Sequence, residues 1–98
     1  MLPKIATTVK LTGKIKNAEG EPIRNVVVVL ISPRGTVLSS TTDVEGSYSF
    51  VVPPSTQGYR LIPSKDGFIF APVDRVLMGI TEDQKGVDFL GKSEPAKP

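Results

Sequence analysis

Apolar and polar side chains alternate with a period of two over residues 9–16, which predicts a β-strand. The apolar positions of this segment should face a core, and Lys10, Lys14 and Lys16 should face solvent. Because a row of outward lysines discourages association through strand edges, we expect this strand at the edge of a sheet.

A run of six apolar residues, Val26 to Ile31, predicts a second strand of another kind. Its residues are β-branched at nearly every position, which disfavours a helix and suits a strand. Such uninterrupted apolarity is typical of a central strand that is covered on both faces, or of a strand with one face that awaits a partner.

Clusters of glycine, proline, asparagine and aspartate divide the rest of the chain into short extended segments. The further predicted strands are residues 36–42, 47–52, 59–62, 68–70, 73–80 and 87–90. This makes seven or eight strands at intervals of about ten residues, with no helical stripe. The pattern predicts an all-β sandwich or a small barrel.

The composition fits one ordered domain of 98 residues, with 39% hydrophobic and 22% charged side chains. We assign residues 9–91 to this domain, residues 1–8 to an N-terminal linker and residues 92–98 to a C-terminal linker. The net charge of +2, without a basic run, argues against a nucleic-acid partner. The longest apolar run is too short for direct membrane insertion.

Neither histidine nor cysteine occurs in the sequence. Their absence excludes Ser-His and Cys-His catalytic pairs, zinc sites with histidine or thiolate ligands, and disulfides. We therefore expect no enzymatic activity and no cofactor.

Short motifs follow one another in a defined order along residues 11–89. They are Gly13-Lys14-Ile15, Gly20-Glu21-Pro22-Ile23, Val26, Val28, Leu30, Thr42-Asp43, Gly46, Tyr48, Phe50, Tyr59, Leu61, Lys65-Asp66-Gly67-Phe68, Phe70, Pro72 and Val87-Asp88-Phe89. In this order and spacing they resemble the carboxypeptidase regulatory-like domains, which are transthyretin-like sandwiches related to the Cna-B and SdrD B-type surface modules. The resemblance implies an antiparallel Greek-key β-sandwich.

The same resemblance implies an accessory module beside catalytic, adhesive or transport domains, often outside the cytoplasm. We therefore expect a non-catalytic spacer or protein-interaction domain of a larger secreted or cell-surface protein, with neighbouring domains or another subunit as partners. An accessory domain that binds carbohydrate or calcium is the alternative. We interpret Met1 as the start of an excised domain, whereas a natural Met1 would allow a cytoplasmic location.

Two ligand sites follow from this alternative. Calcium prefers six to eight oxygen ligands, and the densest acidic pair, Asp43 and Glu45, offers two carboxylates. A structural reading of Asp43 is that its side chain bonds to the backbone of its own turn. A glycan surface needs exposed rings, but all six aromatic residues have a core assignment, and Tyr59 is the best exception because its hydroxyl needs a partner.

The valine-rich strand carries the candidate interaction patch. If Val26, Val28 and Leu30 face the core, then Val27, Val29 and Ile31 face outward. Either the terminal segments of the chain cover these three residues, or they pack against a neighbouring domain or subunit.

Overall fold

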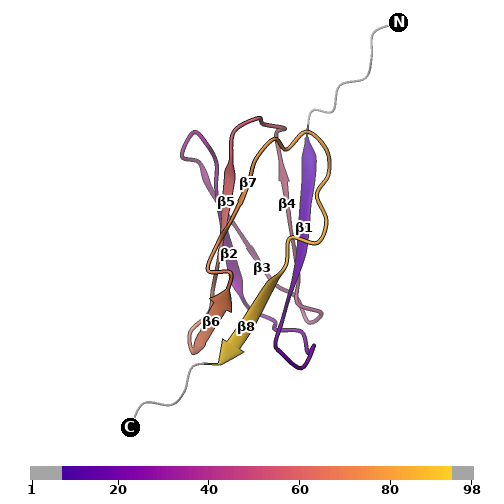
Figure 1. The fold of residues 1–98 in the computed structure, drawn as a ribbon, viewed down its shortest axis with the longest axis vertical. Coiled ribbons are helices and arrows are strands. Elements are labelled where there is room, and N and C mark those ends of the chain that lie inside the picture. The colour runs from indigo at the N-terminus through magenta and orange to yellow at the C-terminus, as the bar shows by residue number, and fades with distance from the viewer. Residues whose placement is uncertain (1–7, 94–98) are drawn as a thin grey trace, which may run out of the picture.

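The computed structural model describes residues 8–93, which form two stacked sheets of four strands each (Figure 1). The strands are β1 (Val9–Lys16), β2 (Val27–Ile31), β3 (Val37–Thr41), β4 (Ser47–Val52), β5 (Tyr59–Ser64), β6 (Phe68–Ala71), β7 (Arg75–Leu77) and β8 (Phe89–Ser93). The described part of the chain contains no helix, and so none that could cross a membrane. The predicted all-β sandwich is confirmed, and the higher of the two expected strand counts is the one observed.

One sheet has the order β4-β1-β8-β6 and the other β3-β2-β5-β7. β2 lies between β3 and β5, so the prediction of a central valine-rich strand is confirmed. Most pairs are antiparallel, as expected, but β1 and β8 pair in parallel, with Ile15 opposite Phe89 and Lys16 opposite Leu90. The last strand ends at Ser93, two residues past the domain end placed at residue 91. Of the linkers expected at residues 1–8 and 92–98, the parts at residues 1–7 and 94–98 lie outside the described residues.

The prediction that residues 9–16 form an edge strand is wrong. β1 pairs with β4 along one side, and along the other side it meets residues 83–88 before β8 begins. The backbone N–H of Gln84 donates to the carbonyl of Lys10, and the N–H of Thr12 donates back to the carbonyl of Gln84, both at 2.9 Å. The outward lysines therefore mark the solvent face of an internal strand and not a sheet edge.

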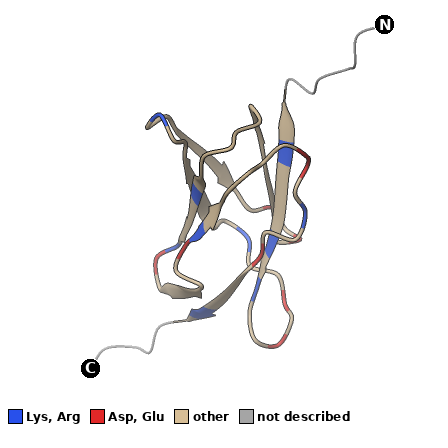
Figure 2. Ribbon diagram, turned by 45° about the horizontal axis from the view of Figure 1, so that its top comes forward, with Lys and Arg blue, Asp and Glu red and all other residues tan. Residues whose placement is uncertain are grey.

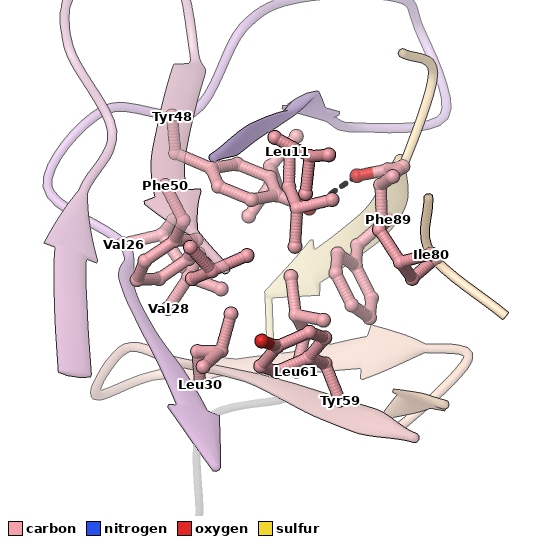
Figure 3. Close-up of a cluster of buried hydrophobic side chains, with 14 of the residues drawn as sticks. Leu11, Val26, Val28, Leu30, Tyr48, Phe50, Tyr59, Leu61, Ile80 and Phe89 are labelled. Atoms are coloured by element: carbon pink, nitrogen blue, oxygen red, sulfur yellow. Dashed lines mark hydrogen bonds between the residues drawn. The ribbon is translucent and has the colours of Figure 1, made fainter. Parts of the chain in front are cut away.

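The core lies between the two sheets and consists of inward side chains from both (Figure 3). Residues at alternate positions supply it, as the period of two requires. Its fully buried members include Leu11 and Ile15 from β1, Val28 and Leu30 from β2, and Leu61 from β5. The inward assignment of Val28 and Leu30, and of Val26 just before β2, is confirmed.

A buried hydrogen bond crosses β1 and joins β4 to the segment before β8. The hydroxyl of Tyr48 donates to the carbonyl oxygen of Val87, and Figure 3 shows this bond as a dashed line. The bond passes over Gly13, where a Cβ atom would lie 1.8 Å from the Val87 oxygen and 2.7 Å from the Tyr48 oxygen. A glycine is therefore required at residue 13 because any side chain would occupy the space of this bond.

The buried hydroxyl of Thr42 fixes the entry into β2. It accepts a hydrogen bond from the N–H of Val26 at 2.9 Å and donates to the carbonyl of Ile23 at 2.8 Å. Both backbone groups would otherwise be buried without a partner, which is costly. Thr42 thus holds the start of the valine-rich strand in register with the core.

Candidate interaction surface

Cross-strand register gathers the outward apolar residues of the second sheet on one surface. Val29 lies opposite Ile62 of β5, and Ile31 lies opposite Val37 of β3. Because directly paired residues point to the same face of a sheet, these side chains project together, away from the core. Val76 of β7 joins them through its pairing with Arg60. We call this surface the valine face: Val27, Val29, Ile31, Val37, Ile62 and Val76.

The side chains of the valine face differ in exposure. Val37 and Val76, on the two edge strands, are 61% and 57% exposed, and Val27 is 39% exposed. Val29, Ile31 and the adjoining Ile62 occupy the centre of the sheet and are half-buried. The outward direction predicted for Val27, Val29 and Ile31 agrees with this pattern. The alternative that terminal segments cover them involves residues outside the described range.

Polar groups border the valine face. Arg60 lies between Ile31 and Val76 in the same row of paired residues. Its Nε donates to Oδ2 of Asp74 at 2.6 Å, which is the single ion pair within residues 8–93. The remaining outward partners are hydroxyl residues of β3 and β5, namely Ser39, Thr41 and Ser64. An apolar centre with a polar border is the usual composition of a protein-protein contact surface.

The outer face of the other sheet has a different composition. Lys10, Lys14 and Lys16 are exposed along β1, which carries blue bands in Figure 2. Lys14 lies opposite Ser47 of β4, Lys10 opposite the exposed Val51, and Lys16 opposite Leu90 of β8. We call this surface the lysine face. The carboxylates nearest to it bind backbone groups: Asp83 accepts from the N–H of Lys10, and Asp88 from the N–H of Lys14, both at 2.8 Å.

The candidate calcium residues Asp43 and Glu45 lie in the turn between β3 and β4. Oδ1 of Asp43 accepts hydrogen bonds from the N–H groups of Glu45 at 2.9 Å and Ser47 at 3.0 Å. This arrangement is the turn-capping role expected on structural grounds. Across residues 8–93 no group of three or more acidic side chains gathers, so the structure offers no further carboxylates to complete a calcium shell around this pair.

The aromatic residues give no exposed platform for a sugar. Tyr48, Phe50, Tyr59 and Phe89 are buried, whereas Phe68 and Phe70 are partly buried against the core. The prediction that Tyr59 would be the exception is wrong. Its side chain is buried and its hydroxyl donates to the carbonyl oxygen of Pro53 at 2.5 Å, so the backbone of the preceding loop supplies the partner that the hydroxyl needs.

The sequence pattern predicts three of the six residues of the valine face. The period of two identified the outward residues of β2, but Val37, Ile62 and Val76 are joined to them by strand register. An alternating pattern gives the direction of each side chain within its own strand and contains no information on which strands pair.

Comparison with known proteins connects this geometry to a family. The carboxypeptidase regulatory-like domain family matches residues 10–87, which span every strand from β1 to β7. No curated protein matches the chain.

Proposed function

The chain belongs to the carboxypeptidase regulatory-like domain family, and from this membership we propose that it is a structural and interaction module whose valine face packs against a neighbouring domain of a larger polypeptide. Domains of this family are small, non-catalytic β-sandwiches. The observation that carries the proposal is the valine face itself, to which all four strands of one sheet contribute apolar side chains.

Apolar side chains that remain in contact with water cost free energy. Burying apolar surface is favourable by about 25 cal/mol for each square ångström, so a sheet face of branched side chains is stabilised by a cover. Monomeric domains seldom expose contiguous apolar patches, and those that do often use them for binding. The valine face gathers six apolar side chains, with Arg60 between Ile31 and Val76 and hydroxyl side chains beside β2.

A neighbouring domain of the same polypeptide is the occupant that suits the strand geometry best. β1 starts at one end of the sandwich and β8 finishes at the opposite end (Figure 1). The two ends of the described chain therefore lie at opposite ends of the sandwich, and the valine face extends along its side between them. Contacts within one chain also need less apolar area than contacts between free molecules, because the linker raises the effective concentration.

The proposed setting is a secreted or cell-surface parent protein, in keeping with the resemblance of the chain to surface modules. Fractionation of cells that produce the full gene product tests this part of the proposal. Recovery of the protein only from the cytoplasm would contradict it and would leave the role of the valine face unchanged.

The interaction is tested by placing a charge on each outer face in turn. Val29→Lys puts an ammonium group in the valine face, and Val51→Lys makes the same change on the outer face of β4, where Val51 is 61% exposed. In the parent polypeptide, we expect Val29→Lys to separate the melting transition of this domain from that of its neighbour. Val51→Lys should leave the two transitions joined.

Thermal melts of the isolated domain provide the control. Both variants should remain folded because both side chains point away from the core. Equal behaviour of the two variants in the parent polypeptide would contradict the proposal. Unfolding of the isolated Val29→Lys domain would contradict the outward placement of that side chain.

A further inference from the structure

A hollow of about 840 Å³ opens at the end of the sandwich where β4 leads into β5, the upper end in Figure 1. Its walls come from the turn between β2 and β3, from the loop between β4 and β5, and from Thr81. This end of the molecule is separate from the valine face, whose side chains project from the outside of one sheet. Its volume lies within the range of pockets that hold small organic ligands.

The floor of the hollow is apolar. Leu30, Val52 and Tyr59 contribute buried side chains, and Pro53 and Pro54 stand beside them. Leu30, Val52 and Tyr59 are at most 3% exposed, so the core is closed beneath the hollow. An apolar floor of this kind favours a ligand with a hydrocarbon or aromatic body.

Leu38 is the most informative residue of the lining. It pairs directly with Leu30 and therefore points inward, towards the core. Leu30 is fully buried, yet Leu38 is 40% exposed, because the hollow begins beside it. An inward leucine that remains open to solvent is an incompletely filled position of the core, and a ligand would bury it.

The rim of the hollow is held in place by hydrogen bonds. In the β2–β3 turn, the N–H of Gly35 donates to the carbonyl of Ser32, and the N–H of Thr36 donates to the hydroxyl of Ser32. On the other side, the N–H of Ser55 donates to the carbonyl of Ile80 at 2.8 Å. A site that already has its shape loses less conformational entropy when a ligand binds.

One cation stands at this rim. Among residues 8–93, Arg34 is the single charged residue that lines the hollow, and it lies in the fixed turn after Pro33. The ion pair found within residues 8–93 joins Arg60 to Asp74, so the guanidinium of Arg34 has no carboxylate within 4 Å there. Its planar donors match the two oxygens of a carboxylate.

From this arrangement we propose that the hollow binds a small carboxylate with an apolar body, of the size of a medium-chain fatty acid. The apolar body covers Leu38 and lies beside Pro53 and Pro54, and the carboxylate pairs with Arg34. The charge complementarity at Arg34 distinguishes such an acid from an uncharged apolar compound. This inference is independent of the proposed role of the valine face, which involves other side chains.

Titration of the 98-residue chain with decanoate, followed by amide chemical shifts, tests the proposal. We expect saturable shifts in the turn at residues 32–36, in the loop at residues 53–57 and at Leu38. Decanol provides the apolar body without the charge and should bind about tenfold more weakly, the difference that one charge-assisted contact gives. Acetate provides the charge without the body and should cause no saturable shift.

Variants assign the two parts of the ligand. Arg34→Gln should weaken decanoate binding about tenfold and leave decanol binding unchanged, because it removes only the charge. Leu38→Ser should weaken both ligands, whereas Lys16→Gln, at the opposite end of β1, should change neither. Thermal melts confirm that each variant is folded.

Three results would overturn the proposal. These are shifts that map to the valine face in place of the hollow, titrations of decanoate that do not saturate below its micelle concentration, and equal decanoate affinity for the Arg34→Gln variant and the unaltered chain. The first of these would show that the apolar chain adheres to the exposed sheet face.

Discussion

The two outer faces of the sandwich are built on the same backbone plan and differ in chemistry. Each belongs to a four-stranded sheet whose inner side supplies the core. On the lysine face, β1 alternates buried apolar residues with exposed lysines, as a half-solvated strand should. On the valine face, β2 is apolar on both sides. Folding requires one apolar side for each strand, and β2 has a second one.

This difference distinguishes the side chains that folding requires from those that it does not require. The sandwich folds with lysines on the outer side of β1. An outward position in a strand therefore does not require a β-branched residue. Val29 and Ile31 are half-buried at the centre of their sheet, and the exposure of Val37 and Val76 leaves the patch open at both edges. The apolar outer side of β2 is the feature on which the proposed contact with a neighbouring domain rests.

The largest effect is expected from Gly13→Ala, which tests how the sheet of the lysine face is held together. The added methyl would stand 1.8 Å from the Val87 oxygen, in the path of the bond from Tyr48. We expect a loss of about 3 kcal/mol in the free energy of unfolding, because neither backbone can move without breaking pairs along β1. Urea denaturation measures it.

Lys10→Ala is the matched control for this prediction, since Lys10 lies on the same strand and is exposed. Its free energy of unfolding should stay within about 0.5 kcal/mol of the unaltered chain. A Gly13→Ala variant as stable as this control would show that residues 83–88 can leave β1 without cost, and that β1 behaves as the edge strand that its lysines first indicated.

That mistaken expectation shows where sequence reasoning reaches its limit. The fold class, the inward sides of β1, β2 and β4, and the outward residues of β2 follow from side-chain periodicity, which sequence contains directly. The contact of residues 83–88 with β1 is made by backbone groups of Gln84 and Val87 and by the carboxylates of Asp83 and Asp88, which accept from backbone N–H groups of β1. Backbone groups are present at every residue, so the sequence does not indicate which ones pair. The alternation of apolar and polar residues therefore could not predict which segments pair with β1.

Some features of the candidate sites were likewise predictable from the sequence, and others were not. Asp43 in its turn was predictable, because an aspartate before a glycine turn bonds to local backbone. The partner of Tyr59 was not, because the carbonyl of Pro53 meets its hydroxyl only once β4 and β5 are packed. The hollow at Leu38 likewise depends on where three separate loops end, which no local pattern determines.

An intermediate effect is expected from Thr42→Val, which tests the sheet of the valine face. The substitution keeps the shape of the side chain and removes its hydroxyl, so the N–H of Val26 and the carbonyl of Ile23 lose their partners. We expect a loss of about 2 kcal/mol, with hydrogen exchange accelerated first at the start of β2. Thr41→Val, at the exposed neighbouring position, is the control and should change the stability little. Equal stability of the two variants would contradict the role assigned to Thr42.

The smallest effect at neutral pH is expected from Tyr48→Phe, at about 1 kcal/mol, since one buried hydrogen bond to Val87 is lost. Its pH dependence is more informative. Burial raises the pKa of Tyr48 above its ordinary value, and the charge of Asp88 raises this pKa further. The folded chain then keeps a proton that the unfolded chain releases above about pH 10, so this contribution to stability is present below that pH and is lost as the pH rises.

Comparison of the two proteins by urea denaturation between pH 8 and pH 11, roughly the range over which tyrosine titrates, isolates this contribution. Both chains carry the same lysines, whose titration cancels in the difference. The unaltered chain should lose its advantage over Tyr48→Phe as the pH passes about 10. A difference that stays constant with pH would mean that the Tyr48 hydroxyl is solvated in the folded state. In that case the sheet of the lysine face would be open at β1, and the contrast with the valine face would rest on composition alone.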